Sequence, residues 1–375
     1  MAPIPIDYST NTGASGVKSL LMKKPLAPSG ALNEFEHFDL TPVIGREYPG
    51  LNVVDLMESP HANELLRELA YIIAARGVVF LRKQNNLTPE LQKRFVQRLG
   101  ELSGKPTESG VHIHPVLNSK SKVPGISKDD EIMSVNSDVF KELYTNKHAD
   151  TTRSDKKQSS DLWHSDITWE KVPSDYTALR LTLLPPTGGD TCWASGYEMY
   201  DRISEPLQKF FETLNFTFHR AEYNATAKAN GAVFYTERRG HPENVGEELR
   251  AIHPAVRTHP VTGWKSFYAA GAGVGYYNDV TPEESDMLLS YANKILKDNH
   301  DLQVRWHWNN VDDMAIWDNR CTYHNATYDF GGIGDRAGVR AMSVAEKPYL
   351  DPVSKSRREA AKEKGVAIGD WVKVA

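Results

Sequence analysis

Three residues of this 375-residue chain have types and spacing that suit a metal ion: His164, Asp166 and His324. One residue separates His164 from Asp166, and side chains two positions apart on a strand point to the same face, so both can reach one ion. The third ligand must come from elsewhere, and His324 is the candidate. Two histidines and one carboxylate on one face of an octahedral ion leave three positions open, which suits oxygen chemistry at iron(II).

A second pair of histidines has the same strand spacing. His112 and His114 are also two residues apart, but no carboxylate follows them at a useful offset. We keep them as an alternative metal pair, and we treat His114 as a candidate pocket residue. The two cysteines, Cys192 and Cys321, show no zinc-ligand spacing, which predicts reduced thiols and no disulfide framework.

Two arginines near the end of the chain could bind anions. Arg336 and Arg340 are four residues apart, so on a strand both guanidinium groups project to one face, with little bulk from Gly338 between them. The planar guanidinium suits bidentate recognition of a carboxylate or a sulfonate. A strand that starts soon after His324 can bring this pair near the metal. Without the metal motif, two exposed arginines on a strand would be the simpler interpretation.

The elements that must position these residues are mainly strands. Short strand-like runs separated by Pro and Gly turns predict a sandwich or jelly roll rather than a parallel doubly wound sheet. These runs are 176–184, 191–193, 214–219, 255–258, 265–269, 304–308, 314–318 and 340–344. Helical spacing at 62–75 and 89–99, on either side of a short buried strand at 77–82, predicts an α/β layer before them.

We divide the chain into three parts. Residues 1–33 are rich in Pro, Ser, Gly, Ala and Lys and are interpreted as an extended arm, and residues 351–375 as a polar, helical tail. Residues 34–350 are expected to form a single domain. Within it, the polar stretch 118–161 predicts a long surface excursion that acts as a lid.

Composition excludes several classes of protein. With 40% hydrophobic and 25% charged residues, the chain can bury a full core. A formal net charge of −5 gives no dense basic face, so nucleic acid is not an expected partner. Apolar runs stay short of the roughly 18 to 20 residues that span a bilayer, and the N-terminus lacks a signal-peptide pattern. We therefore expect a cytoplasmic protein with no membrane partner, and homo-oligomerisation is compatible with these features.

Four ordered motifs surround the candidate residues. They are Trp163–Asp166 (WHSD), Pro185–Trp193 (PPTGGDTCW), Trp317–His324 (WDNRCTYH) and the pair Arg336 and Arg340. Together they resemble the TauD/TfdA (taurine dioxygenase-like) family of Fe(II)/2-oxoglutarate-dependent dioxygenases, over roughly residues 50 to 350. The resemblance implies an α+β fold with a mainly β core, a double-stranded β-helix (jelly roll) with flanking helices.

The resemblance also implies the ligands of the metal and of the co-substrate. His164, Asp166 and His324 match the iron ligands, and Thr191 and Arg336 match the groups that bind the distal carboxylate of 2-oxoglutarate. The implied cofactors are Fe(II), 2-oxoglutarate as co-substrate and O2. The implied reaction oxidises a C–H bond of a small anionic substrate (sulfonate, carboxylate or amino acid) and releases succinate and CO2.

The primary substrate has its own set of matched residues. Arg340 and His114 match contacts to the substrate anion, and Trp169, with Ile167, matches the wall of the substrate pocket. Strand alternation alone would place Trp169 opposite His164, so the chain must turn after the HxD motif for this match to hold.

The sequence departs from the taurine enzymes at the substrate site. Leu117 stands three residues after His114, where those enzymes have Tyr, and Ser160 stands four residues before His164, where they have Asn. The segment 268–275 also lacks side chains that many members carry, which predicts a smaller and smoother wall. Because two polar contacts to a sulfonate are replaced, we expect an acid with a more apolar body than taurine.

Two other functions fit parts of the pattern. A metallohydrolase could use the same His/Asp/His site with a water nucleophile, because these ligands also suit zinc. It would leave Thr191 and the paired arginines without a shared role. A non-catalytic jelly-roll binding protein with structural histidines is the other alternative, since fold does not dictate function. Oxygen uptake that depends on 2-oxoglutarate and iron(II) distinguishes the dioxygenase from both.

Overall fold

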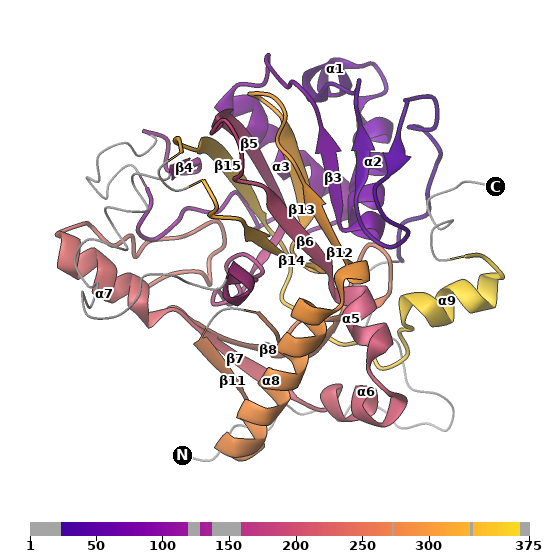
Figure 1. Cartoon of the computed structure of the whole chain (residues 1–375), viewed down its shortest axis with the longest axis vertical. Coiled ribbons are helices and arrows are strands. Elements are labelled where there is room, and N and C mark those ends of the chain that lie inside the picture. Colours follow the sequence, from indigo (N-terminus) through magenta and orange to yellow (C-terminus); the bar gives the residue numbers. More distant parts are fainter. Residues whose placement is uncertain (1–23, 119–127, 137–158, 272–273, 331–332, 368–375) are drawn as a thin grey trace.

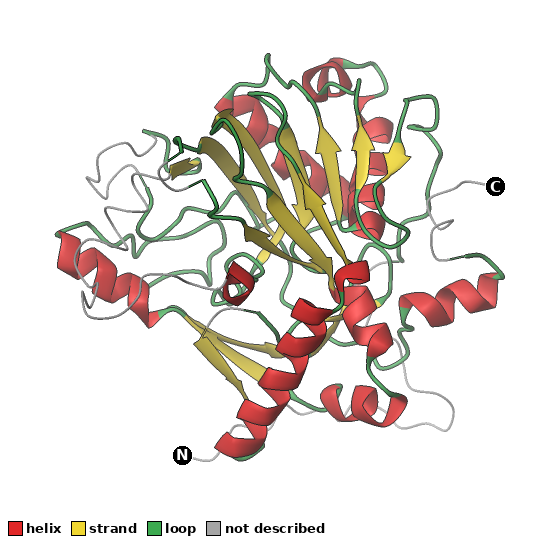
Figure 2. Cartoon of the chain, viewed as in Figure 1, coloured by secondary structure: helices red, strands yellow, loops and turns green. Residues whose placement is uncertain are grey.

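Two β-sheets face each other, and helices cover the outer face of the larger sheet (Figure 1). The structure is a computed structural model that describes residues 24–118, 128–136, 159–271, 274–330 and 333–367. Figure 2 shows that strands form the centre of the molecule and that most helices lie at its periphery. The predicted α+β class is therefore confirmed as a mixed fold with several sheets.

The strands of the described residues have short to medium lengths. They are β1 Phe38–Asp39, β2 Arg46–Tyr48, β3 Val78–Leu81, β4 Met133–Asn136, β5 Ser174–Leu183, β6 Thr191–Ser195, β7 Asn215–His219, β8 Arg250–Pro254, β9 Val256–Thr258, β10 Lys265–Phe267, β11 Val274–Tyr277, β12 Gln303–Trp306, β13 Met314–Asp318, β14 Thr322–Ala326 and β15 Ala337–Val344. The larger sheet has the order β1-β2-β3-β13-β5-β15-β4 and the smaller facing sheet the order β12-β6-β14. A third sheet, β11-β7-β8, and the pair β10-β9 complete the β structure.

The helices differ in how strongly the sequence signals them. They are α1 Val53–Glu58, α2 Ala62–Arg76, α3 Pro89–Ser103, α5 Gly196–Arg202, α6 Glu205–Phe211, α7 Ala221–Asn230, α8 Pro282–Asp298 and α9 Arg357–Lys364, with 3-10 turns η2 Ser159–Leu162 and η3 His300–Leu302. The α2 and α3 helices agree with the helical spacing of the sequence, and α9 lies in the expected helical tail. The helices α1, α5, α6, α7 and α8 were not predicted from the sequence. The capping box of Thr281 and Glu284 at the start of α8 is a signal that could have found that helix.

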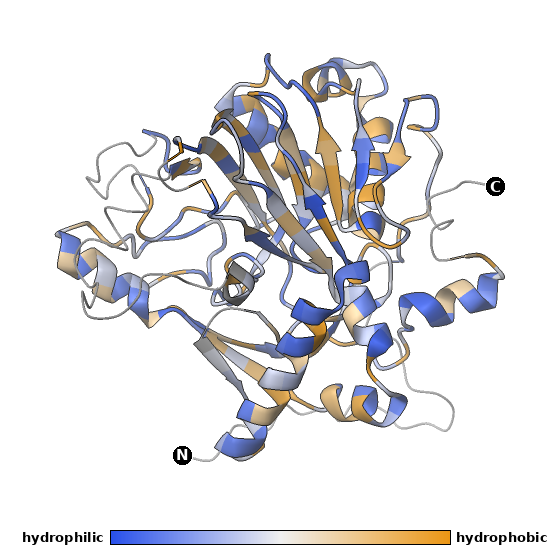
Figure 3. Cartoon of the chain, in the orientation of Figure 1, coloured by the Kyte–Doolittle hydropathy of each residue, from blue (hydrophilic) through white to orange (hydrophobic). Residues whose placement is uncertain are grey.

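The larger sheet is buried on both faces, and β3 shows why. Val79 and Leu81 belong to the core beneath α2 and α3. Val78 and Phe80, which alternate with them, belong to the core between the two sheets. There the Phe80 ring stacks on Trp306 of the smaller sheet with centroids 4.5 Å apart. Figure 3 shows hydrophobic residues, in orange, along central strands such as β3 and on the helices that pack against this sheet.

The predicted arm and lid are only partly within the described residues. Residues 24–33 of the arm lie against the domain: the Leu26 N–H donates to the Val261 carbonyl at 2.9 Å, and Leu32 is buried. Most of the stretch 118–161 lies outside the described residues. Its described part includes β4, which pairs with β15 as an edge strand of the larger sheet. The lid and the domain boundaries therefore stay predictions.

Among the helices of the described residues, none combines the length and the apolar character that crossing a membrane requires.

Candidate active site

His164, Asp166 and His324 come together where the smaller sheet meets the larger one. His164 and His324 form an antiparallel bridge in which each backbone N–H donates to the other residue's carbonyl, at 3.0 and 2.8 Å. Asp166 Oδ1 lies 3.9 Å from His164 Nε2 and 3.7 Å from His324 Nε2. One ligand atom from each residue lies within 4.8 Å of the others, so the three side chains can face one ion.

The backbone around the HxD motif is not the continuous strand that the spacing suggested. His164 pairs at a single bridge, and the chain turns directly after Asp166. Ile167 has a positive φ of 48°, and the Glu170 N–H closes the turn by donating to the Ile167 carbonyl at 2.9 Å. The chain thus turns where the pocket assignment of Trp169 required it to turn.

Protonation states suit a metal ion at this position. His164 Nδ1 lies 2.8 Å from the Leu162 carbonyl, to which only a protonated nitrogen can donate, so the Nε2 lone pair is left for a metal. Burial lowers the pKa of His164 and places that of His324 well below its usual value. Burial alone would raise the pKa of Asp166, but Arg340 and the two histidines hold it at about 2. Two neutral imidazoles and one carboxylate are the donors of an iron(II) facial set.

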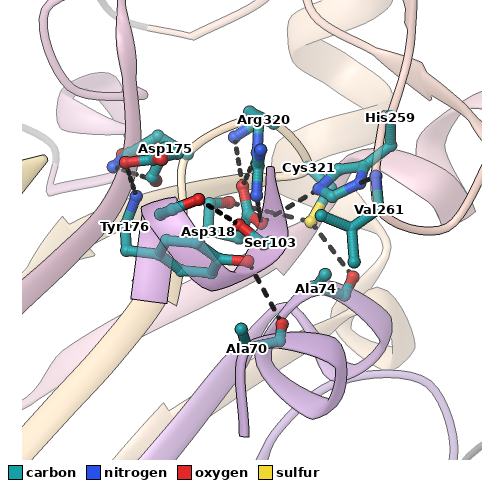
Figure 4. Close-up of polar contacts among 12 residues, drawn as sticks. Ala70, Ala74, Ser103, Asp175, Tyr176, His259, Val261, Asp318, Arg320 and Cys321 are labelled. Atoms are coloured by element: carbon teal, nitrogen blue, oxygen red, sulfur yellow. Dashed lines mark hydrogen bonds and ion pairs between the residues drawn. The ribbon is translucent and has the colours of Figure 1, made fainter. Parts of the chain in front are cut away.

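A second group of possible ligands lies at the corner between β13 and β14 (Figure 4). The ligand atoms of His259, Asp318 and Cys321 also lie within 4.8 Å of one another. However, Asp318 Oδ2 already accepts from His259 Nε2 at 2.9 Å and from Arg320 Nη2 at 2.7 Å. Arg320 and His259 hold the pKa of Asp318 well below its usual value, although burial opposes its ionisation. This cluster fixes the corner from which β14 carries His324.

The two histidines of the alternative pair have other partners among the described residues. His112 Nε2 lies 3.2 Å from Glu170 Oε1, and Glu170 also binds Arg239 through both carboxylate oxygens. His114 Nδ1 accepts from the backbone N–H of Leu117 at 2.9 Å. Within the described ranges, neither histidine belongs to a group that could hold a metal ion.

Arg336 and Thr191, which the resemblance assigned to 2-oxoglutarate, lie in direct contact. Arg336 Nη2 donates to Thr191 Oγ1 at 3.2 Å, and its Nε donates to the Gly189 carbonyl at 3.0 Å. Burial lowers the pKa of Arg336 to about 10. The indole N–H of Trp308 also donates to Thr191 Oγ1, at 3.1 Å. Sequence reasoning missed Trp308, because it lies outside the quoted motifs.

Arg340 takes a different position from Arg336. Arg336 lies just before β15, whose pairing with β5 is irregular between Ala337 and Gly338, whereas Arg340 lies within the strand. Arg340 Nη1 donates to Asp166 Oδ1 at 3.0 Å. Its Nε is buried and has no hydrogen-bond partner among the described residues. The two guanidinium groups therefore have different partners: that of Arg336 contacts Thr191, and that of Arg340 contacts Asp166.

Two of the remaining substrate candidates, His114 and Trp169, contact one tyrosine. Tyr223 of α7 contacts the ring of His114 at 5.2 Å and the ring of Trp169 at 5.9 Å between centroids. Leu117 and Ile167 are buried, and Ser160 is partly exposed in η2, just before His164. Tyr223 was missed because α7 was not predicted, and no local motif marks it.

Acidification should destabilise the fold through His253, a buried histidine that contacts the turn after Asp166. His253 Nε2 lies 2.9 Å from the Thr168 carbonyl and 3.0 Å from the Glu170 carbonyl. Burial lowers the pKa of His253 to about 4 from 6.5. Below pH 6.5 the unfolded chain binds a proton that the folded chain does not bind, so stability should fall as the pH falls towards about 4, by up to about 3 kcal/mol. Thermal unfolding across this range should show a shallower dependence in His253→Gln, and an equal dependence would contradict this assignment.

Two histidines and one carboxylate whose ligand atoms converge are typical of the non-haem iron(II) oxygenases, a class that includes the 2-oxoglutarate (alpha-ketoglutarate)-dependent dioxygenases. The family model "Taurine catabolism dioxygenase TauD, TfdA family" matches residues 36–342. The chain belongs to this TauD/TfdA family of alpha-ketoglutarate-dependent dioxygenases.

Individual relatives and a solved structure agree with this family. The chain is 49% identical over 346 residues to the alpha-ketoglutarate-dependent dioxygenase btcD of Neocamarosporium betae, covering 91% of this chain and 99% of that protein. It is 47% identical over 338 residues to the alpha-ketoglutarate-dependent dioxygenase oryG of Aspergillus oryzae, covering 90% and 96%. A taurine dioxygenase structure from Burkholderia xenovorans matches with a TM-score of 0.62 at 24% identity, over 85% of this chain and 94% of that one, which shows a shared fold.

Proposed function

We propose that His164, Asp166 and His324 bind iron(II), and that Arg336 and Thr191 bind the distal carboxylate of 2-oxoglutarate. The convergence of three ligand atoms within 4.8 Å carries this proposal. The larger sheet and the smaller sheet that faces it would then be the two halves of a double-stranded β-helix. When bound, iron supplies the activation of O2 that is coupled to oxidation of 2-oxoglutarate to succinate and CO2.

The chain's own residues orient the reactants. Arg336 offers a planar donor set to a carboxylate in a buried place, where such a contact is strong. Thr191 adds a hydroxyl, which Arg336 and Trp308 hold in position. A metallohydrolase would leave this buried cation without a role, so the oxygenase is the better interpretation.

The primary substrate should be a small acid. Arg340 Nε is a buried donor without a hydrogen-bond partner among the described residues. His114 Nδ1 accepts two backbone N–H groups, so the proton of the neutral ring lies on Nε2, which can donate to an anion. The rings of Trp169 and Tyr223 and the side chain of Leu117 offer apolar surface to the rest of the substrate. We therefore propose an acid with an apolar body.

Arg340→Ala should raise the KM for the primary substrate by about 30-fold or more, because a buried anion losing a charged partner costs on the order of 2 to 5 kcal/mol. Slow succinate formation without substrate should persist. Since Arg340 also contacts Asp166, iron must be saturating, and iron affinity should be measured in parallel. An unchanged KM, with loss of 2-oxoglutarate affinity instead, would exchange the roles of Arg340 and Arg336.

The substrate class is tested by a succinate-release screen over sulfonates, sulfate esters, amino acids, and aryloxy or other carboxylic acids. We expect kcat/KM for a branched or aromatic acid to exceed that for taurine. Related acids should compete, because a methylene or two of apolar burial discriminates by only about 1 to 3 kcal/mol. A clear preference for taurine would show that Leu117 and Ser160 do not set the specificity.

A further inference from the structure

The two oxygens of the Asp166 carboxylate have different surroundings. Oδ1 is the oxygen that lies near the Nε2 atoms of His164 and His324. Oδ2 accepts a hydrogen bond from Thr177 Oγ1 at 3.1 Å. Thr177 lies on β5 in the larger sheet and is fully buried. Thr177 therefore holds the oxygen that faces away from the histidines, while Oδ1 also accepts from Arg340 Nη1 at 3.0 Å.

Asn319, at the corner between β13 and β14, contacts the same motif at several points. Its Oδ1 accepts from the Asp166 backbone N–H at 3.1 Å, and its backbone carbonyl accepts from Ser165 Oγ at 2.8 Å. Its Nδ2 donates to Thr177 Oγ1 at 2.8 Å. Asn319 thus joins the corner that leads to His324 with the turn that carries Asp166.

The directions of the hydrogen bonds that link Trp317, Asn319 and Thr177 to Asp166 follow from which atoms can donate. The indole N–H of Trp317 donates to Asn319 Oδ1 at 3.0 Å, which fixes the amide so that Nδ2 faces Thr177. Because an amide nitrogen only donates, the Thr177 oxygen accepts. The hydroxyl hydrogen of Thr177 is then directed to Asp166 Oδ2.

We propose that Thr177 and Asn319 are positioning residues that present a single oxygen of Asp166, Oδ1, to the metal. This inference rests on the proposed metal site. If Oδ2 were free to rotate inward, the carboxylate could take two metal positions, and one of the positions that 2-oxoglutarate and O2 need would be lost. Neither residue is one of the proposed metal ligands; both act through Asp166.

The test is a titration of the full chain with Mn(II) in the absence of iron. The electron paramagnetic resonance signal of free Mn(II) measures how much of the metal remains unbound. Thr177→Val keeps the shape and removes the hydroxyl, and it should raise the Kd for Mn(II) by about 10- to 100-fold, as expected for a second-sphere partner. Thr177→Ser restores the hydroxyl and should stay within about threefold of the wild type.

Thr217→Val is the matched control. Thr217 is also fully buried on a strand, β7 of the third sheet, and its hydroxyl donates to Asn278 Oδ1 at 2.9 Å rather than to a metal ligand. It should lower thermal stability without changing the Kd for Mn(II). If the role of Thr177 were only structural, Thr177→Val would behave in the same way, and that result would overturn the proposal.

A second variant decides the matter if Thr177→Val does not fold. Asn319→Asp keeps an acceptor for the Asp166 N–H but removes the donor to Thr177, so it should also weaken Mn(II) binding. Wild-type affinity in this variant would contradict the proposal. Failure of the wild type to bind one Mn(II), or unchanged binding in His324→Ala, would instead remove the metal site itself.

Discussion

Alanine at position 164, 166 or 324 is expected to abolish stoichiometric iron binding and turnover. Each of His164, Asp166 and His324 supplies one of three convergent donors, and two donors leave an incomplete facial set. The loss of iron affinity should exceed the roughly 100-fold upper range that is typical for second-sphere changes. Iron content after anaerobic reconstitution and succinate release measure both effects.

The apo proteins provide the control for these three variants. His164→Ala and His324→Ala should keep their fold, as circular dichroism would report, because the bridge between these residues is made by backbone groups. Asp166→Ala also removes a partner of Arg340, so a modest change of stability is expected there. One iron per chain and near-wild-type succinate release in any variant would exclude that residue from the site.

Arg336→Ala should raise the KM for 2-oxoglutarate by about 30-fold to more than 1,000-fold, since a buried carboxylate losing a bidentate charged partner costs on the order of 2 to 5 kcal/mol. Iron affinity should change little, because Arg336 donates hydrogen bonds to the Gly189 carbonyl and to Thr191 Oγ1, and neither residue is a proposed metal ligand.

Arg336→Lys is the matched control for charge. It keeps a cation but loses the planar donor pair, so its KM for 2-oxoglutarate should lie between those of the wild type and Arg336→Ala. A 2-oxoglutarate KM that is unchanged in both variants, with weaker binding of the primary substrate, would contradict the assignment.

Local patterns in the sequence were sufficient for much of the fold and of the candidate site. The run 314–318 coincides with β13, and helical spacing located α2 and α3 to within a few residues. Each of these patterns lies within one short segment, so the secondary structure of that segment can be predicted from its own residues. The proximity of Thr191 and Arg336 followed instead from the resemblance, which supplies contacts between distant positions.

Contacts between distant segments without a known motif could not be predicted. Thr177 lies far from Asn319 in the chain, and neither the strand alternation nor the spacing shows that they share a hydrogen bond. Tyr223 meets His114 only because α7 places it there. His112 shows that a favourable spacing is not sufficient for metal binding. Its ring contacts Glu170, which lies in the turn after the metal motif, and the sequence does not predict this partner.

We propose that this chain couples the oxidation of a small acid to that of 2-oxoglutarate at His164, Asp166 and His324. The most direct measurement is turnover under 18O2 with iron(II), 2-oxoglutarate and the best acid of the screen, followed by mass spectrometry of both products. We predict equimolar succinate and oxidised substrate, with one 18O atom in succinate, and no product from Asp166→Ala. Succinate without the label would show that O2 does not oxidise 2-oxoglutarate here, and equal product from Asp166→Ala would show that Asp166 is not a metal ligand.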